Sequence, residues 1–515
     1  MSKAHVYARN LAANWGGYGL NLLVMFFMSP FVVHSLGDVR YGVWSLLMSL
    51  TGYLGLVEAG TNAGLGRYVN VYLAKNDIPN VNGVLNTALA VFAVLGVVLL
   101  IFSGGLALIL GVVFPTIPID LRSQSQIVLL LVAANLWLAF LSAAFRQILT
   151  AHERFDICTA IDLAVLTIST TGTIVVLITG RGLVELAAVQ VVSSTLGVAC
   201  GYLLSKRIFP QLELNFRRAS RWQLRQLLGF SIWAFINRVA LRLLYTTDTV
   251  VIIIVLGPKQ VTYYAIAGLL VIRSRDFIGK VTSIFGPQMI QDCARENLRD
   301  LRISFRRGST LVMAFAIPLL VGLIVFGKEF LILWMGPTYA VSYPVLLILA
   351  MSQFPALPAS ITEHIYRGMH RVRLGAMVTL LQGIINLGLT LLFVLTFKMG
   401  IDGVAWGTFY PRVVFSIVAG VIALRWIHLE IWEFVRFTVL RWIAVTAAFF
   451  AVCEFVQALV PHQSWTVFFA KVISVMVIYA PLVWFLLLEH QDQQRIRDVV
   501  FKRVGLQTPT VTTDE

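Results

Sequence analysis

Apolar stretches of about 20 or more residues recur along the whole chain, and they constrain its fold most strongly. A helix of this length spans the roughly 30 Å hydrocarbon core of a bilayer. Hydrophobic residues make up 58% of the 515 residues and charged residues only 13%, which is typical of a membrane protein. The pattern predicts an all-α polytopic membrane protein with about 14 transmembrane helices, at residues 15–36, 41–64, 84–114, 127–148, 157–179, 183–208, 227–256, 261–285, 310–335, 341–365, 374–397, 404–424, 437–460 and 465–488.

The basic residues predict the orientation of these helices. Most of the 40 Lys and Arg residues lie in alternate connections, on the side that holds the N-terminus. Cytoplasmic connections carry such an excess, so we expect both termini in the cytoplasm and Lys259, Lys398 and Lys471 on the periplasmic side. We expect the first stretch to be a retained helix, not a removed signal peptide.

The net charge of +15 follows from this topology, so it does not indicate a nucleic-acid partner. Two basic segments, 215–225 and 287–307, resemble helices that lie on an anionic leaflet. Membrane lipids are therefore expected partners.

An internal repeat predicts the domain organisation. Leu36-Gly37 recurs as Leu256-Gly257, and His152 recurs as His370, at offsets of about 220 residues. Two six-helix bundles related by a pseudo-twofold axis along the membrane normal would give this spacing. The predicted domains are an N-terminal lobe (1–214), a C-terminal lobe (215–436), two additional transmembrane helices (437–490) and a cytoplasmic tail (491–515).

The predicted hairpin 227–285 carries charges deep within its two apolar stretches. Residues equally far from its turn at Gly257-Pro258 lie at similar depth, which brings arginines of both helices together near the middle of the membrane. An arginine there costs about 2.5–3.5 kcal/mol unless it faces water or a partner. We therefore predict a cationic cavity that accepts an anion, lined by Arg238, Arg242, Arg273, Arg275 and Arg412.

The acidic residues of the same region offer a different interpretation of these arginines. A structural ion pair, such as Arg238 with Asp276, is the alternative to an anion-binding cavity. The candidate ion-coupling groups or charge partners are Glu58, Asp248 and Asp276.

No pattern in the sequence indicates catalysis, a metal site or a cofactor. The four cysteines are scattered, without metal-ligand spacing. Gly322-x4-Gly327-Lys328 resembles the start of a phosphate-binding loop, but Glu329 follows where Ser or Thr is required, inside an apolar stretch. We interpret this match as a coincidence, and we expect a protein that is not an enzyme.

Several motifs in chain order carry a family resemblance. They are Leu36-Gly37-x3-Tyr41-Gly42-x-Trp44, Gly55-Leu56-Val57-Glu58-x-Gly60 with Arg67-Tyr68, and Thr247-Asp248 followed by Leu256-Gly257 and Tyr264-Ala265. With these motifs the chain resembles the polysaccharide transporters of the multidrug/oligosaccharidyl-lipid/polysaccharide (MOP) exporter superfamily, especially Wzx-type O-antigen flippases. Glu58 stands where the family leads us to expect aspartate, which weakens an ion-coupling role at this position.

The resemblance implies a flippase for surface polysaccharide biosynthesis, located as a multi-pass protein in a bacterial inner membrane. Its substrate would be an undecaprenyl-pyrophosphate-linked oligosaccharide, moved from the cytoplasmic to the periplasmic leaflet by alternating access. The polysaccharide polymerase and chain-length machinery would be further partners. Two alternatives stay open: a cation- or proton-coupled drug or metabolite antiporter of the same superfamily, and a membrane glycan polymerase or ligase.

Overall fold

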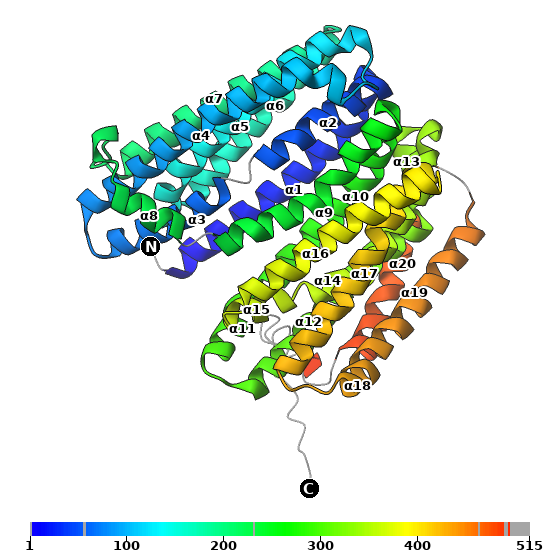
Figure 1. Ribbon diagram of the computed structural model, residues 1–515. Coiled ribbons are helices and arrows are strands. Elements are labelled where there is room, and N and C mark those ends of the chain that lie inside the picture. The colour runs from blue at the N-terminus through cyan, green and yellow to red at the C-terminus, as the bar shows by residue number, and fades with distance from the viewer. Residues whose placement is uncertain (1–2, 55–57, 230–231, 462–463, 489–492, 495–515) are drawn as a thin grey trace. The chain divides into compact units, whose positions relative to one another are not determined.

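The computed structural model describes residues 3–54, 58–229, 232–461, 464–488 and 493–494. Within these ranges some further side chains are not described, among them those of Glu58 and Arg238. The described residues are mainly helical and contain no strand (Figure 1). The helices are α1 (Lys3–Leu36), α2 (Asp38–Leu54), α3 (Glu58–Ala74), α4 (Ile78–Val113), α5 (Ile119–Ala151), α6 (Phe155–Ile178), α7 (Leu183–Ile208), α8 (Arg221–Gly229), α9 (Ile232–Val255), α10 (Pro258–Ser283), α11 (Gly286–Ala294), α12 (Leu298–Val325), α13 (Gly327–Met335), α14 (Tyr343–Ala359), α15 (Thr362–Gly368), α16 (Val372–Leu391), α17 (Gly400–Trp426), α18 (Ile431–Phe434), α19 (Leu440–Leu459) and α20 (Trp465–Leu482).

Short helical segments of other types extend some of these helices. They are the 3-10 helices η1 (Phe216–Arg218) and η2 (Pro337–Ser342) and the π-helices η3 (Leu392–Thr396), η4 (Val435–Val439) and η5 (Val483–Leu487).

Length and composition allow 11 of the described helical segments to cross a membrane, and these coincide with 11 of the predicted spans. The other three predicted spans fall on α2 and α3, on α9 and on α10. In the second, the segment Thr246–Val255 is apolar, and the third carries Arg273, Arg275, Asp276 and Lys280. The all-α polytopic membrane fold is confirmed. Two of these three regions, α9 and α10, carry arginines of the expected site.

The helices form two compact units along the chain. Unit 1 comprises 1–266 and 372–408, and unit 2 comprises 267–371 and 409–515. The units differ from the predicted lobes, because α9 and α16 lie beyond residue 214 and yet pack within unit 1. The predicted domain boundaries at 214, 436 and 490 stay a prediction.

Unit 1 is built around α4, α5 and α7, which pack side by side (Figure 1). Phe92 on α4 and Phe140 on α5 meet in its core, with ring centroids 6.0 Å apart. Glycine allows the close approach of these two helices, since a Cβ on Gly96 would lie 2.2 Å from the Trp137 ring. A side chain at Gly96 would therefore force these two helices apart or displace the Trp137 ring.

Unit 2 has its own apolar core, formed by α12 with α14, α19 and α20. Phe449 on α19 and Tyr479 on α20 lie with ring centroids 4.6 Å apart. The Tyr479 hydroxyl donates a hydrogen bond of 2.8 Å to the carbonyl of Ala314 on α12, which satisfies its polar end inside the helix bundle. The two additional C-terminal helices are thus packed members of unit 2.

The internal repeat is visible in the backbone of corresponding turns. The turn from α3 to α4 and the turn from α11 to α12 share three hydrogen bonds at a constant offset of 220 residues, for example Asp77 N–Tyr72 O and Asn297 N–Asp292 O. The residues with positive φ match too, at 53° for Asn76 and 56° for Glu296. Two other pairs of turns also share a residue with positive φ. These residues are Gly37 and Gly257, at an offset of 220, and Glu153 and His370, at an offset of 217.

The last pair corrects one expected correspondence by a single residue. The α5–α6 turn has the hydrogen bond His152 N–Ile148 O, and its counterpart in the α15–α16 turn is Met369 N–Ile365 O. His152 therefore corresponds to Met369, and His370 corresponds to Glu153. The histidines at 152 and 370 suggested an alignment that is wrong by one residue, although the two turns do correspond.

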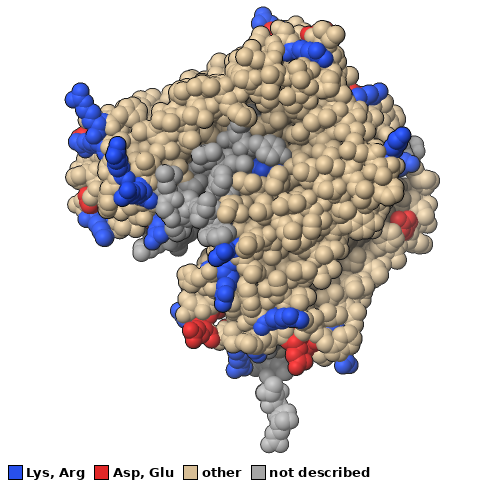
Figure 2. Space-filling model, in the orientation of Figure 1, with Lys and Arg blue, Asp and Glu red and all other residues tan. Residues whose placement is uncertain are grey.

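Charged side chains lie mainly at the ends of the helices. On the face drawn in Figure 2, Lys and Arg gather near the helix ends, and the middle parts of the helices are largely uncharged. Exposed apolar side chains lie in the middle of α4, as at Val98, Ile101 and Phe102. Such surfaces suit contact with lipid tails.

Candidate functional site

A buried carboxylate on α9 is the centre of a polar cluster within unit 1. Asp248 is 5% exposed. Its Oδ2 accepts a hydrogen bond of 2.6 Å from the Tyr264 hydroxyl on α10 and one of 2.9 Å from the Thr408 hydroxyl on α17. Asn386 on α16 donates to Thr408 at 2.8 Å. One carboxylate thus connects four helices.

Small residues make this convergence of helices possible. A Cβ on Gly383 of α16 would lie 3.0 Å from the Leu243 Cβ on α9, and a Cβ on Gly407 of α17 would lie 2.3 Å from the Thr390 hydroxyl. The three helices therefore approach one another more closely than larger residues would allow. Oxygen atoms of Asp248, Thr408 and Tyr264 gather where they meet. Such a group of oxygens suits a hard cation or a proton.

The arginines of the predicted cavity are divided between the two units. Arg242 lies on α9 in unit 1 with an exposed side chain. In unit 2, Arg273 and Arg275 on α10 are half-buried, and Arg412 on α17 is 5% exposed. The predicted meeting of Arg242 with Arg273 across the units stays a prediction.

Asp276, one of the candidate charge partners, forms an ion pair with Arg273 within unit 2. Nη1 of Arg273 lies 3.3 Å from Oδ2 of Asp276, one helical turn further along α10. About a third of each side chain is exposed, so this pair keeps access to an added anion. Of the other predicted site residues, Glu58 and Arg238 lie outside the described side chains.

An ion pair that the sequence reasoning missed lies buried in unit 2. Glu329 on α13 and Lys471 on α20 are each 3% exposed. The ammonium donates to the two Glu329 oxygens at 3.1 and 2.9 Å and to Oε1 of Gln457 on α19 at 3.1 Å. The periplasmic side expected for Lys471 stays a prediction, but its ammonium is buried within the first two turns of α20.

The same pair explains the apparent phosphate-binding motif. Gly322 lies inside α12, and Gly327 begins α13. The expected strand-loop-helix is therefore not formed by these described residues, and Glu329 serves a salt bridge instead. Opposite charges in two apolar stretches, Glu329 and Lys471, were the signal that could have revealed the pair.

A protein family and a bacterial membrane protein resemble this chain in sequence. Residues 92–344 match a family model described as "Polysaccharide biosynthesis protein". The uncharacterized membrane protein EpsK of Bacillus subtilis (strain 168) is 21% identical over 495 residues, which cover 95% of this chain and 96% of EpsK.

Solved structures share the fold at low sequence identity. The lipid II flippase MurJ in an inward closed conformation superposes with a TM-score of 0.72 at 14% identity, over 95% of this chain and 99% of MurJ. A multidrug resistance MATE family transporter of the MOP superfamily, in an inward-facing conformation, gives a TM-score of 0.70 at 13% identity, over 79% of this chain and 94% of the transporter. These findings confirm the resemblance to MOP-superfamily polysaccharide transporters. Together with the family match, they support a flippase or transporter rather than an enzyme.

Proposed function

We propose, from the premise that this chain is a MOP-superfamily transporter, that it flips an undecaprenyl-pyrophosphate-linked oligosaccharide from the cytoplasmic to the periplasmic leaflet. The observation that carries this proposal is the set of arginines within α9, α10 and α17, at Arg242, Arg273, Arg275 and Arg412. They lie several turns from the ends of helices that a transporter of this fold holds in the membrane. The family description and the flippase fold support the same substrate class.

Electrostatics explains why a pyrophosphate would need these side chains. A group with two or more negative charges is costly to move from water into hydrocarbon. Guanidinium groups replace its hydration with charge-assisted and often bidentate hydrogen bonds. The half-exposed Arg273 and the exposed Arg242 suit this role best. The lipid tail would stay in the bilayer while the glycan crosses through water.

The buried Asp248 cluster supplies a candidate for the driving force. In this proposal, the carboxylate exchanges its hydroxyl partners for a proton or a metal cation during the cycle. The contacts of Asp248 reach α10, α16 and α17, so a change of its charge would alter the packing of four helices at once. Alternating access requires such a link between ligand and helix arrangement.

A drug or metabolite antiporter is the second candidate function, because the MATE transporter shares the fold. A cavity for cationic drugs would favour acidic side chains. The middle parts of α9, α10 and α17 instead carry Arg242, Arg273, Arg275 and Arg412. Asp276 is already paired with Arg273. We therefore favour an anionic substrate.

The test compares arginine variants in cells that depend on this protein for their surface glycan. Arg242→Ala and Arg273→Ala should abolish surface glycan while the protein reaches the membrane at normal levels. Lys at either position keeps the charge but loses the planar fork, so it should restore transport only in part. Arg207→Ala, at the exposed end of α7, is a matched control that should keep activity.

The second arm uses purified protein in proteoliposomes. Translocation of a fluorescent undecaprenyl-pyrophosphate-linked disaccharide should exceed that of the corresponding neutral glycolipid. Uptake of a cationic dye, without movement of the pyrophosphate lipid, would favour the antiporter instead.

A further inference from the structure

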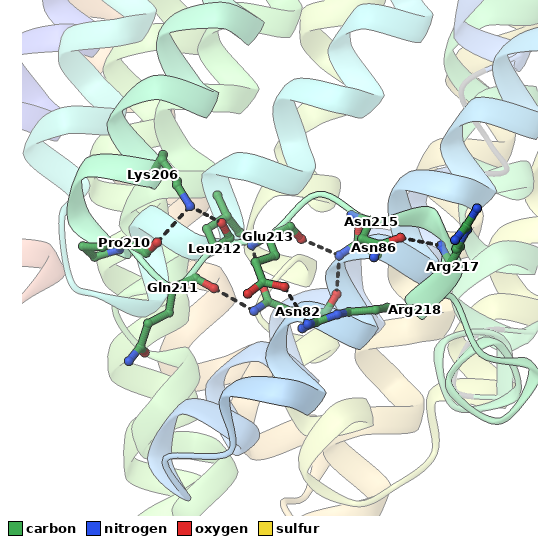
Figure 3. Close-up of polar contacts among 10 residues, drawn as sticks. All are labelled: Asn82, Asn86, Lys206, Pro210, Gln211, Leu212, Glu213, Asn215, Arg217 and Arg218. Atoms are coloured by element: carbon green, nitrogen blue, oxygen red, sulfur yellow. Dashed lines mark hydrogen bonds and ion pairs between the residues drawn. The ribbon is translucent and has the colours of Figure 1, made fainter.

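The segment that follows α7 lies against α4 and is held there by two buried asparagines. We define residues 210–220 as the strap. The side-chain amide of Asn82 donates to the carbonyl of Gln211 at 2.8 Å and accepts from the Glu213 amide at 3.0 Å. Asn86 repeats this pattern one turn later, donating to the Glu213 carbonyl at 2.7 Å and accepting from the Asn215 amide at 2.8 Å (Figure 3).

The spacing of the two asparagines matches an extended chain. Four residues of a helix rise about 6.0 Å, and two residues of an extended segment advance about 6.6 Å. Side chains at positions i and i+4 of α4 can therefore bind every second peptide group of the strap. Asn82 and Asn86 take the place of a neighbouring β-strand. Both are fully buried, so these contacts are shielded from water.

Further bonds fix both ends of the strap. The Lys206 ammonium, at the end of α7, donates to the carbonyls of Pro210 at 2.8 Å and Leu212 at 2.5 Å (Figure 3). The Ser220 amide donates to the Thr87 hydroxyl at 3.1 Å. The strap is consequently an ordered part of unit 1. Its many polar and charged residues alone would also have suited a flexible linker.

The ordered strap and the first turn of α8 expose large apolar side chains. Phe216 is 62% exposed and Trp222 is 56% exposed, with Leu214 close to them in the chain. Exposed arginines surround them, at Arg217, Arg221 and Arg225, while Arg218 is paired with Glu213 at 2.6 Å. Aromatic rings beside arginines are typical of surfaces that lie at the headgroup level of a membrane.

The position of the strap along the chain places it at the membrane edge. The exposed apolar face of α7 continues to Leu203 and is followed by the exposed basic residues Lys206 and Arg207. This change from apolar to basic marks the end of a transmembrane helix. The strap begins immediately afterwards, so Phe216 and Trp222 lie within reach of the headgroups.

We propose that the strap and α8 form a fixed docking surface for anionic phospholipid headgroups. Arg217, Arg221 and Arg225 would bind the phosphates, and Leu214, Phe216 and Trp222 would enter the interface between them. Asn82 and Asn86 act as positioning residues, because a surface that is ordered beforehand loses little conformational entropy on binding. This inference is independent of the substrate that the protein transports.

The test measures the depth of the strap in bilayers of defined charge. The full chain, without its four native cysteines, carries a spin label at Leu214→Cys and is reconstituted into phosphatidylcholine alone or mixed equally with phosphatidylglycerol. Oxygen reports burial in lipid, and a water-soluble nickel chelate reports exposure to water. We expect the label to be shielded from nickel only in the anionic bilayer. Each arginine should raise the equilibrium ratio of membrane-immersed to water-exposed strap about fivefold in the anionic bilayer.

Two variants separate the parts of the proposal. The triple change Arg217→Gln, Arg221→Gln and Arg225→Gln should return the label to water in the anionic bilayer. Asn82→Leu with Asn86→Leu should weaken immersion although every arginine is kept. A label at Leu203→Cys is the control, and it should stay accessible to oxygen in all samples if the variants fold.

The outcomes that contradict the proposal are distinct. Access of nickel to residue 214 in both lipids would exclude docking altogether. Equal immersion in both lipids, unaffected by the triple change, would exclude recognition of headgroup charge. An unchanged depth in the asparagine variant would exclude Asn82 and Asn86 as positioning residues.

Discussion

The ammonium of Lys471 on α20 lies 2.9 Å from a carboxylate oxygen of Glu329 on α13, and both side chains are almost completely buried. Removing one member of such a pair leaves an unpaired buried charge, at a cost of about 3–5 kcal/mol. Lys471→Met should therefore lower the unfolding temperature in detergent strongly, whereas the double variant with Glu329→Met should recover most of the loss. Lys328→Met, at the exposed neighbour, is the control and should change little. Equal effects of Lys471→Met and Lys328→Met would contradict a stabilising pair.

The membrane topology can be tested at the turn between α9 and α10 and at the turn between η3 and α17. Lys259 and Lys398 are predicted to face the periplasm. Single cysteines at these positions, in a chain that lacks the native four, should react with an impermeant thiol reagent added to intact cells. A cysteine at Arg217 should react only after the cells are opened. Labelling in the reverse order would invert the proposed orientation and with it the direction of transport.

The thiol of Cys293, on the short helix α11, offers a pH-dependent test of local packing. Partial burial and the neighbouring Asp292 both raise the pKa of this thiol. Less thiolate is then present at neutral pH, so Cys293 should react with maleimide more slowly than a cysteine introduced at the exposed Ala294. Its rate should continue to rise at a pH where the rate of the exposed cysteine has levelled off. Asp292→Asn should move the Cys293 profile toward lower pH. Identical profiles for the two cysteines would show that α11 is not packed as described.

Stretch length and charge predicted most of the helices, because crossing a bilayer leaves few other choices for an apolar chain of this length. The turn at Gly257-Pro258 was also predictable, since Gly257 has a φ of 90° and Pro258 begins α10. Chain order did not predict which helices pack together. α16 joins α9 in unit 1 through a close contact at Gly383, and such a contact depends on helix rotation that no stretch of sequence reveals.

The sequence predicted which residue types form the candidate site, but it did not predict which residues bond to one another. Asp248 and Tyr264 belong to a recognisable motif, but their hydrogen bond joins residues on two helices, and Thr408 comes from much later in the chain. The burial of Lys471 was not predicted, because it lies near the start of its apolar stretch, where a lysine normally reaches water. A buried carboxylate on another helix reverses that preference. Asn82 and Asn86 lie at the boundary of the predicted helix 84–114, and no pattern in the sequence indicated that they bind the segment after α7.

Arg273 and Asp276 allow a test of whether the arginines bind substrate or only neutralise acids. If Arg273 serves only its 3.3 Å contact with Asp276, the loss caused by Arg273→Ala should be relieved by adding Asp276→Asn. If Arg273 binds a pyrophosphate, surface glycan should stay absent in the double variant. We expect no relief, and normal amounts of protein in the membrane for all three variants. Recovery of glycan in the double variant would leave the pair as a structural contact.

The Asp248 cluster allows a sharper test, because its partners can be changed one at a time. Asp248→Asn removes the charge but keeps the size of the side chain. We expect it to abolish the dependence of translocation on a proton or sodium gradient in proteoliposomes. Tyr264→Phe and Thr408→Val each remove one hydroxyl that donates to Oδ2. Each should shift the cation concentration for half-maximal transport by about 10–150-fold, the equivalent of about 1.5–3 kcal/mol per hydrogen bond to a charged group.

A purely structural role for Asp248 predicts a different pattern. In that case Asp248→Asn should reduce the amount of folded protein, and the gradient dependence of the remaining protein should be unchanged. Thr390→Val on α16 is a suitable control, because it removes a buried hydroxyl from the same helix contact without touching the carboxylate in any described hydrogen bond. Retained gradient dependence in Asp248→Asn, with Thr390→Val equally impaired, would exclude Asp248 as the coupling group, since burial of the cluster alone would then account for both variants.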